Sequence, residues 1–149
     1  MKILVIDDNK QINDYWSLEL FRMNFSVESS FSIEQTYTLL EKNSFDLILL
    51  DLHLGTNVCD GFEIIDYINR KKFSTSVIVI SGNNIEDFDE SQLLKIKNSF
   101  AFVKKPCLKN ELTLVIEKWL TYVKNKNIIS YGKYELDSNK KIIYKNKKF

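Results

Sequence analysis

Acidic residues follow two strongly apolar runs of the chain. Asp7 and Asp8 come after residues 2–6, KILVI, and Asp51 comes after residues 47–50, LILL. Burying an unpaired charge is unfavourable, so an acid that follows a buried run needs a partner or must emerge into solvent. Carboxylates that lie close together repel one another and either bind a cation or shift their pKa values upward. These three acids are therefore the first candidates for a functional site.

Two later apolar runs end in residues that can contact phosphate. Residues 76–80, SVIVI, lead into Ser81, and a run that begins at Phe100 leads into Lys104 and Lys105. Oxygen-only ligands with room for water suit Mg²⁺, which proteins hold through one or two carboxylates together with phosphate oxygens. A phosphoryl group arriving beside a carboxylate would meet Mg²⁺, an ammonium and a hydroxyl, which position it and neutralise its charge. An Asp carboxylate can also accept a phosphoryl group covalently.

Each of these residues also has a simpler interpretation. Asp8 or Asn9 could cap the helix that follows, Ser81-Gly82 could form a turn, and a Lys that precedes Pro106 could be solvated. Four separate apolar runs nevertheless end in such residues. Their joint arrangement favours a functional site.

Five apolar runs alternate with segments of helical periodicity. Most runs are short and continuous, which is typical of strands buried on both faces, and between them apolar residues recur every three or four positions, as at Ile12, Trp16 and Leu20. This alternation predicts βαβ units and a parallel sheet with helices on both faces. We predict an α/β, flavodoxin-like, doubly wound (βα)5 fold with three layers and with function at the carboxyl ends of its strands. The predicted strands are residues 2–6, 25–29, 46–50, 76–80 and 100–104.

Residues 124–149 differ from the rest of the chain. They hold eight Lys against two acidic residues, a net charge of +6, whereas residues 1–123 carry −5. Residues 131–136 and 142–144 predict two strands joined through the turn-rich residues 137–140. Because an isolated two-stranded hairpin is marginally stable, we interpret this segment as a linker and the first strands of an incomplete second domain.

The overall composition argues against several classes of protein. A chain of 149 residues with 44% hydrophobic and 28% charged residues fits one globular domain with a short extension. A net charge of +1 argues against a nucleic-acid-binding surface over the whole chain. No apolar run approaches the roughly 18 residues of a membrane span, and the charged N-terminus is not a signal peptide. We therefore expect a cytoplasmic protein without membrane contact, whose two cysteines, Cys59 and Cys107, are free thiols.

Five motifs in order resemble those of the receiver domain of two-component response regulators, which is CheY-like. The resemblance covers residues 1 to about 123, and the spacings of 30 residues from Asp51 to Ser81 and 24 from Ser81 to Lys105 suit that family. The motifs are VIDD (5–8), LILLDLHL (47–54), DGFEII (60–65), VIVISG (77–82) and FVKKP (102–106).

The resemblance implies a role for each residue of the acidic site. Asp51 would be the phosphoacceptor. Asp7 and Asp8 would hold Mg²⁺ together with Asp51, and the backbone carbonyl of His53 would be a further ligand.

The resemblance also assigns residues of the last two strands. Ser81 would bond the phosphoryl oxygens, and Lys105 would pair with them because the family's Lys directly precedes the Pro. Pro106 would follow a cis peptide bond, a geometry largely confined to proline. Phe102 matches the aromatic residue whose rotamer changes on activation, so Ser81 and Phe102 would form the switch.

A phosphorylation-activated function follows from the resemblance. A sensor histidine kinase would donate the phosphoryl group, and the face formed by the fourth helix, fifth strand and fifth helix would pass the change to an effector, in transcription control. Phosphoryl acceptance and hydrolysis would be self-catalysed, with no separate substrate turned over, so we do not expect an enzyme. Residues 131–149 resemble the first strands of the winged-helix domain of OmpR/PhoB-type regulators, so DNA would be bound only by a C-terminal domain that this chain lacks.

Two departures from the family pattern bear on function. Ten residues separate Asp51 from Gly61 where eight are common, and Gly55 stands where Pro is usual, so we expect altered metal affinity or phosphoryl lifetime. Charged residues that usually join dimers are also replaced, by Phe100-Ala101 and by Val115 and Glu117. Any homodimer through the helix 4, strand 5 and helix 5 face should therefore be more hydrophobic.

Three other functions compete with this interpretation. A degenerate receiver could serve as a phosphorylation-independent protein-interaction module, although the acidic set with Ser81 and Lys105 is complete. An aspartate-nucleophile phosphatase typically needs a second acid two residues after the nucleophile, where this chain has His53. A flavodoxin-like cofactor binder would need a phosphate loop rich in Gly, Ser or Thr after the first strand, where this chain has residues 7–10, DDNK.

Overall fold

The computed structural model contains a five-stranded and a three-stranded sheet. It describes residues 1–55, 61–126, 128–131, 134–137 and 142–145. The chain divides into two compact units, Met1–Cys107 and Leu108–Phe149. No helix in the part of the chain that is described is long and apolar enough to cross a membrane.

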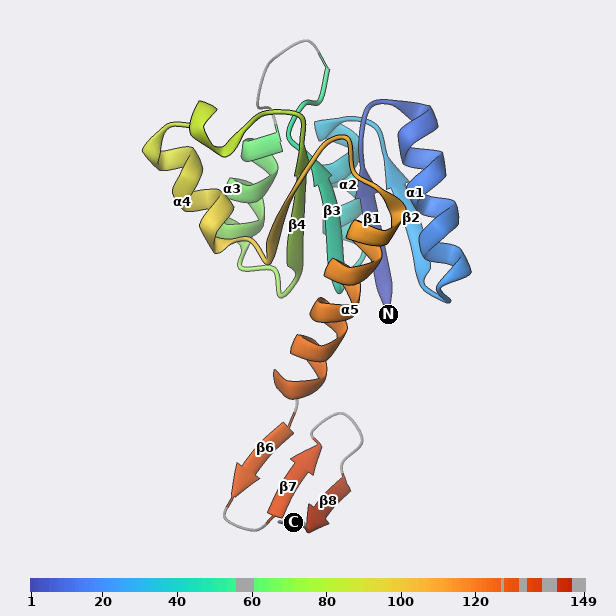
Figure 1. Cartoon of the computed structure of the whole chain (residues 1–149), viewed down its shortest axis with the longest axis vertical. Coiled ribbons are helices and arrows are strands. Elements are labelled where there is room, and N and C mark those ends of the chain that lie inside the picture. Colours follow the sequence, from blue (N-terminus) through green and yellow to red (C-terminus); the bar gives the residue numbers. More distant parts are fainter. Residues whose placement is uncertain (56–60, 127, 132–133, 138–141, 146–149) are drawn as a thin grey trace. The chain divides into compact units, whose positions relative to one another are not determined.

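All five strands of the first unit run parallel, in the order β2-β1-β3-β4-β5. This strand order, with a helix after each strand, is that of flavodoxin-like doubly wound folds, so the predicted fold class is confirmed. In Figure 1 the carboxyl ends of β1, β3 and β4 lie together at the top of the view. The strands are β1 Lys2–Ile6, β2 Ser26–Ser30, β3 Leu47–Asp51, β4 Ser76–Ser81 and β5 Ala101–Lys104. The helices of this unit are α1 Lys10–Arg22, α2 Ile33–Lys42, α3 Gly61–Lys71, the 3₁₀ helix η1 Ile85–Asp87 and α4 Glu90–Asn98.

Side chains alternate between the two faces of this sheet because successive residues of a strand point to opposite sides. One set packs with α2, α3 and α4 in a single apolar cluster, which includes Ile48, Leu50 and Val79. The intervening residues, such as Leu49 and Ile78, are equally buried but lie outside that cluster. The central strands are therefore covered on both faces, as their continuous apolar runs predict.

A buried polar side chain ties the carboxyl end of β1 to its neighbours. Asn13, on α1, is fully buried, and its Nδ2 donates hydrogen bonds to the carbonyl oxygens of Val5 at 3.3 Å, Asp7 at 3.1 Å and Ser30 at 2.9 Å. Burying an amide is unfavourable unless it is hydrogen-bonded, and here its donors serve carbonyls at the ends of two strands. Asn13 thus holds the backbone from which Asp7 projects.

Helix α3 begins in direct contact with the backbone that leaves β3. The Gly61 N–H donates to the carbonyl oxygen of Leu52 at 3.0 Å. A Cβ at position 61 would lie 2.6 Å from the Asp51 carbonyl oxygen and 2.7 Å from the Leu52 Cα. Only glycine permits such a close backbone approach, so Gly61 allows α3 to start immediately beside Asp51.

The second unit combines the last helix with a small antiparallel sheet. Helix α5 spans Lys109–Lys126, and the sheet contains β6 Ile128–Tyr131, β7 Tyr134–Asp137 and β8 Ile142–Lys145. The prediction of one strand over residues 131–136 is wrong, because Tyr131 pairs with Tyr134 and the segment belongs to two strands. The sequence between them contains Gly132, a residue that hairpin turns favour. Asp137, predicted as the first turn residue, is instead the last residue of β7, and residues 138–140 lie outside the described residues.

Replacing the buried amide of Asn13 tests its role at the end of β1. We expect Asn13→Leu, which keeps the branching of the side chain but removes its donors, to lower the free energy of unfolding by about 1–3 kcal/mol, because backbone carbonyls lose their donors. Urea denaturation followed by circular dichroism measures this change. The neighbouring Asp14, which is exposed and paired with Lys10, provides the control: Asp14→Ala should change stability by less than about 0.5 kcal/mol. Equal effects of both substitutions would contradict the role of Asn13.

The close approach at Gly61 generates a second prediction. Gly61→Ala forces its Cβ against the Asp51 and Leu52 backbone and should destabilise the fold by about 1–3 kcal/mol. Gly82 is the matched control, since a Cβ there would meet nothing within 4 Å. Thermal and urea unfolding of the two alanine variants should differ accordingly. A Gly61→Ala protein as stable as Gly82→Ala would show that the contact does not constrain the fold.

Candidate functional site

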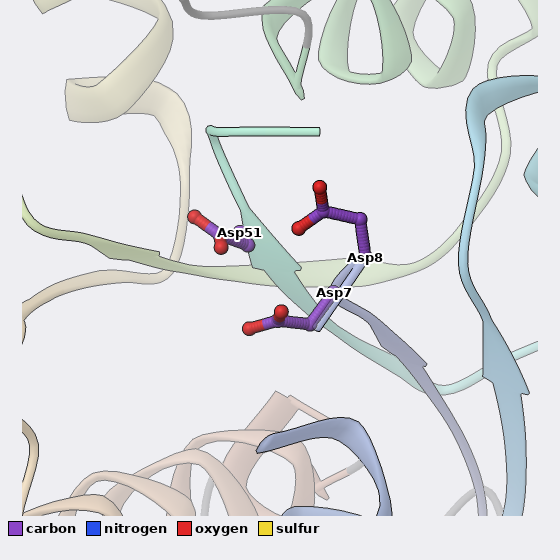
Figure 2. Close-up of side chains that lie close together, drawn as sticks. All are labelled: Asp7, Asp8 and Asp51. Atoms are coloured by element: carbon purple, nitrogen blue, oxygen red, sulfur yellow. The ribbon is translucent and has the colours of Figure 1, made fainter. Parts of the chain in front are cut away.

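Three carboxylates gather at the carboxyl ends of β1 and β3. Asp7 and Asp8 directly follow β1, Asp51 is the last residue of β3, and one carboxylate oxygen from each lies within 4.8 Å of the others. Figure 2 shows the three side chains around a common space. Asp7 and Asp51 are 4% and 5% exposed, whereas Asp8 is exposed. The cluster is thus buried on one side and open to solvent on the side of Asp8.

Lys105 supplies the positive charge that the buried acids need. Its Nζ lies 2.6 Å from Asp51 Oδ2 and 3.1 Å from Asp7 Oδ2. Its backbone N–H donates to the Ser81 carbonyl oxygen at 2.8 Å, and the Lys105-Pro106 peptide bond is cis, as the resemblance implies. The adjacent Lys104 is exposed and donates to the side chain of Asn84. Of the two lysines, the structure therefore brings Lys105 to the acids.

The pKa values of Asp7 and Lys105 are both raised. Burial raises the pKa of Asp7, and the nearby Lys105 ammonium and the Asn9 N–H offset this only in part. Burial by itself would lower the pKa of Lys105. Its hydrogen bond to Asp51 and the negative charges of Asp51 and Asp7 outweigh burial, so the pKa of Lys105 is raised. Lys105 therefore stays protonated at neutral pH.

Backbone N–H groups hold each of the three carboxylates. The Asn9 N–H donates to Asp7 Oδ1 at 2.9 Å, the His53 N–H to Asp51 Oδ1 at 3.0 Å, and the Gly55 N–H to Asp8 Oδ2 at 2.9 Å. Hydrogen bonds to an ionised carboxylate are stronger than neutral ones and fix its orientation. The His53 N–H orients Asp51, and the His53 carbonyl as a metal ligand stays a prediction.

Capping of α1 falls to Asn9, one of the two candidates from the sequence. Its Oδ1 accepts hydrogen bonds from the N–H groups of Gln11 and Ile12 at 3.0 and 3.3 Å. Since Asn9 satisfies the free N–H groups of the helix, the carboxylate of Asp8 remains available to the acidic cluster.

Ser81 lies at the end of β4, between the strands that carry Asp51 and Lys105. It is fully buried, it pairs in register with Lys104, and its Oγ accepts from the Asn83 N–H at 3.2 Å. This hydrogen bond is of the kind that serine forms in turns. The position of Ser81 therefore fits both a turn residue and a phosphate-binding residue. Its contact with phosphoryl oxygens stays a prediction.

Phe102, the predicted switch residue, belongs to a row of three aromatic rings. It is half-buried on β5, and its ring lies edge-on to that of Phe88, with centroids 6.3 Å apart. Phe88 in turn contacts Phe62 of α3 at 5.6 Å. The row thus runs from β5 to the helix that starts beside Asp51, and Phe88 directly precedes the Asp89 cap of α4.

The donor set fits a magnesium ion. Three carboxylates and one ammonium leave a net negative charge of two, which favours a divalent cation, and oxygen is the ligand atom that Mg²⁺ prefers. The exposed position of Asp8 leaves the cluster accessible from solvent. Asp7, Asp8 and Asp51 are the residues that would hold the ion.

Sequence reasoning missed Asn13, and it named Gly55 and Gly61 only for the length of the loop and its missing proline. Asn13 carried a signal, since it is a polar residue in the stripe that Trp16 and Leu20 continue at helical spacing. Gly55 and Gly61 act through their backbones, for which a sequence offers no signal beyond the residue type. Residues 56–60 of the enlarged loop, Cys59 among them, lie outside the described residues.

Comparison with known proteins identifies the family. The family model for the response regulator receiver domain matches residues 3–117. The response regulator protein PilR of Pseudomonas aeruginosa is 30% identical over 105 residues, which are 70% of this chain and 23% of PilR.

Solved structures share the fold. DrrB, an OmpR/PhoB homologue from Thermotoga maritima, matches with a TM-score of 0.64 and 23% identity over 97% of this chain and 63% of DrrB. TrrA of the same organism, solved in complex with Mg²⁺ and BeF, matches with a TM-score of 0.66 and 22% identity over 78% of this chain and 96% of TrrA.

The chain spans less than two thirds of PilR and of DrrB. The family match nevertheless covers every strand of the parallel sheet and all three acids of the cluster. The chain belongs to the response regulator receiver domain family of two-component systems.

Proposed function

We propose that this chain is a phosphorylation-activated switch in which Asp51 accepts a phosphoryl group from a sensor histidine kinase. The observation that carries the proposal is the convergence of Asp7, Asp8 and Asp51 with Lys105 at one edge of the sheet. Receiver domains generally bind Mg²⁺, and the TrrA relative was solved with Mg²⁺ and BeF. Both facts support the same use for this acidic cluster.

The proposed reaction is a phosphoryl transfer between two side chains. A carboxylate oxygen of Asp51 attacks the phosphorus atom of the kinase phosphohistidine. The P–N bond breaks, its electron pair returns to the imidazole, and an acyl phosphate forms on Asp51. Bound Mg²⁺ would neutralise negative charge on the phosphoryl oxygens.

Lys105 and Ser81 stabilise the product in this scheme. The Lys105 ammonium already lies 2.6 Å from Asp51 Oδ2 and can pair with a phosphoryl oxygen bound there. The Ser81 hydroxyl, at the end of the adjacent strand, donates to another oxygen. Water later hydrolyses the acyl phosphate, so the chain catalyses its own phosphorylation and dephosphorylation and turns over no separate small substrate.

The aromatic row provides the route to an output surface. When Ser81 moves toward the phosphoryl group, Phe102 repacks against Phe88, which directly precedes α4. The face formed by α4 and β5 then presents a different surface to an effector. Such a repacking between two arrangements is how local charge changes produce global responses.

Transcription control is the effector function that we propose. DrrB, an OmpR/PhoB homologue, matches over 97% of this chain, and three antiparallel strands follow α5. We propose that residues 1–123 form the receiver domain, that residues 124–149 hold a linker and the first strands of a winged-helix domain, and that a complete domain of this type would bind DNA. A homodimer would use exposed apolar residues, of which Leu94 on α4 and Leu114 on α5 are 59% and 57% exposed.

The alternative is a phosphorylation-independent interaction module that kept the receiver fold. In such a module nothing would require three carboxylates to gather at one edge of the sheet, two of them buried and Asp8 exposed. Formation of an acyl phosphate on Asp51 would distinguish the phosphorylated switch from the interaction module.

Phosphorylation of Asp51 is the first test. Incubation with acetyl phosphate and Mg²⁺ should produce a retarded band in Phos-tag electrophoresis, and Asp51→Asn should abolish it because the amide is no nucleophile. Asp66→Asn is the control, since Asp66 is a surface residue of α3 paired with Lys95. This variant should be phosphorylated like the wild type. A retarded band that persists in Asp51→Asn would move the acceptor elsewhere, and its absence in the wild type would favour the interaction module.

Magnesium binding should stabilise the fold measurably. Mg²⁺ at 100 times its dissociation constant should add about 2.7 kcal/mol to the free energy of unfolding, measured by urea denaturation with MgCl2 or with EDTA. Asp8→Ala should remove most of this gain because it deletes one of three ligands. Asp14→Ala on α1 should keep the gain. If Mg²⁺ stabilised Asp8→Ala as much as the wild type, the ion would bind outside the acidic cluster.

A further inference from the structure

A backbone N–H reaches across the sheet edge to the exposed acid of the cluster. Gly55, in the segment that follows β3, donates through its N–H to Asp8 Oδ2 at 2.9 Å. This bond joins positions 47 residues apart in the chain. In the part of the chain that the structure describes, it is the only hydrogen bond that the Asp8 carboxylate accepts.

The other two acids of the cluster are held differently. Asp7 and Asp51 are buried, each is paired with Lys105, and each also accepts a backbone N–H. Asp8 has no such ion pair among the described residues and is exposed to solvent. Its side chain would therefore be free to rotate away from the cluster if Gly55 did not hold it.

We propose that the Gly55 N–H is a positioning group that fixes Asp8 as a magnesium ligand. This inference rests on the Mg²⁺ site of the proposed function and names the group that sets its affinity. Oδ2 accepts the hydrogen bond, which leaves Oδ1 without a hydrogen bond among the described residues. Hydrogen bonds to a ligating carboxylate orient it, and removing such an outer partner typically lowers metal affinity about 10- to 100-fold.

The backbone conformation explains why glycine occupies this position. Gly55 has φ +80°, in the region that L-residues rarely adopt, and a Cβ there would meet nothing within 4 Å. The constraint on the residue is therefore conformational rather than steric crowding. Two properties of Gly55, its N–H and its positive φ, can consequently be separated by substitution.

Three variants separate these properties. Gly55→Asn keeps the N–H and is the substitution that best tolerates positive φ. Gly55→Ala keeps the N–H but is strained at this φ, and Gly55→Pro lacks the N–H and is also strained. The Mg²⁺ dissociation constant of each is measured by titration with MgCl2, followed by two-dimensional ¹H–¹⁵N NMR. We expect Gly55→Pro to bind Mg²⁺ about tenfold more weakly or worse, and Gly55→Asn and Gly55→Ala to keep affinities close to the wild type.

Gly55→Ala is the decisive control. If it loses as much affinity as Gly55→Pro, loop conformation sets the affinity and the proposal is overturned. Unchanged affinity in Gly55→Pro overturns it as well. A wild-type protein that binds no Mg²⁺ would instead contradict the metal site of the proposed function.

A second measurement needs no metal and does not depend on the folding of Gly55→Pro. In EDTA, the Gly55 amide of the wild type should exchange with solvent more slowly than in Asp8→Ala, which deletes its acceptor. Unchanged exchange of this amide in Asp8→Ala would show that the hydrogen bond does not form in solution. The Asn83 amide, bonded to Ser81 rather than to the cluster, should exchange alike in both proteins.

Discussion

The ion pairs of Lys105 with Asp51 and Asp7 are the interactions on which the site depends. Both acids are almost fully buried at the ends of neighbouring strands, where β1 and β3 pair Ile6 with Leu50. Two such carboxylates repel each other and lose hydration, and the ammonium of Lys105 offsets this cost. Lys105 directly follows β5, and β4 lies between β5 and β3 in the sheet. Only a long, flexible side chain can reach across that strand to the acids.

This requirement explains why the neighbouring backbone is so tightly constrained. Distances of 2.6 and 3.1 Å are maintained only if the ends of four strands keep their relative positions. Asn13 joins the ends of β1 and β2, the register of β4 with β5 sets the place of Lys105, and Gly61 brings α3 against the backbone of Asp51. The apolar core below provides the rigid support, since its strands are buried on both faces.

The same interactions would serve the reversible switch that we propose. A phosphoryl group on Asp51 would give Lys105 a new partner, and the ends of β4 and β5 would adjust around it. The edge-on contacts of Phe102 with Phe88, and of Phe88 with Phe62, connect those strand ends to α3 and to the start of α4. A local change in charge can therefore alter helix packing without loss of the core, because closely packed elements move between discrete arrangements.

The parallel sheet, the strands that end in candidate site residues and the resemblance to the receiver family all follow from the sequence. Periodicity and composition predict the sheet, because a strand buried on both faces is apolar throughout and its polar residues come at its end. The family rests on five motifs that occur in order. The folded chain was needed to show that Asn9 rather than Asp8 caps α1 and that residues 131–136 belong to two strands. It also brings to the acids the Lys105 that the resemblance favours over Lys104. Neighbouring residues can be similar in type while their side chains point in different directions, and the register of the strands sets those directions. The Asn13 and Gly55 hydrogen bonds likewise join segments that are distant in the chain. In each bond one partner is a backbone group, which leaves no trace in the pattern of side chains.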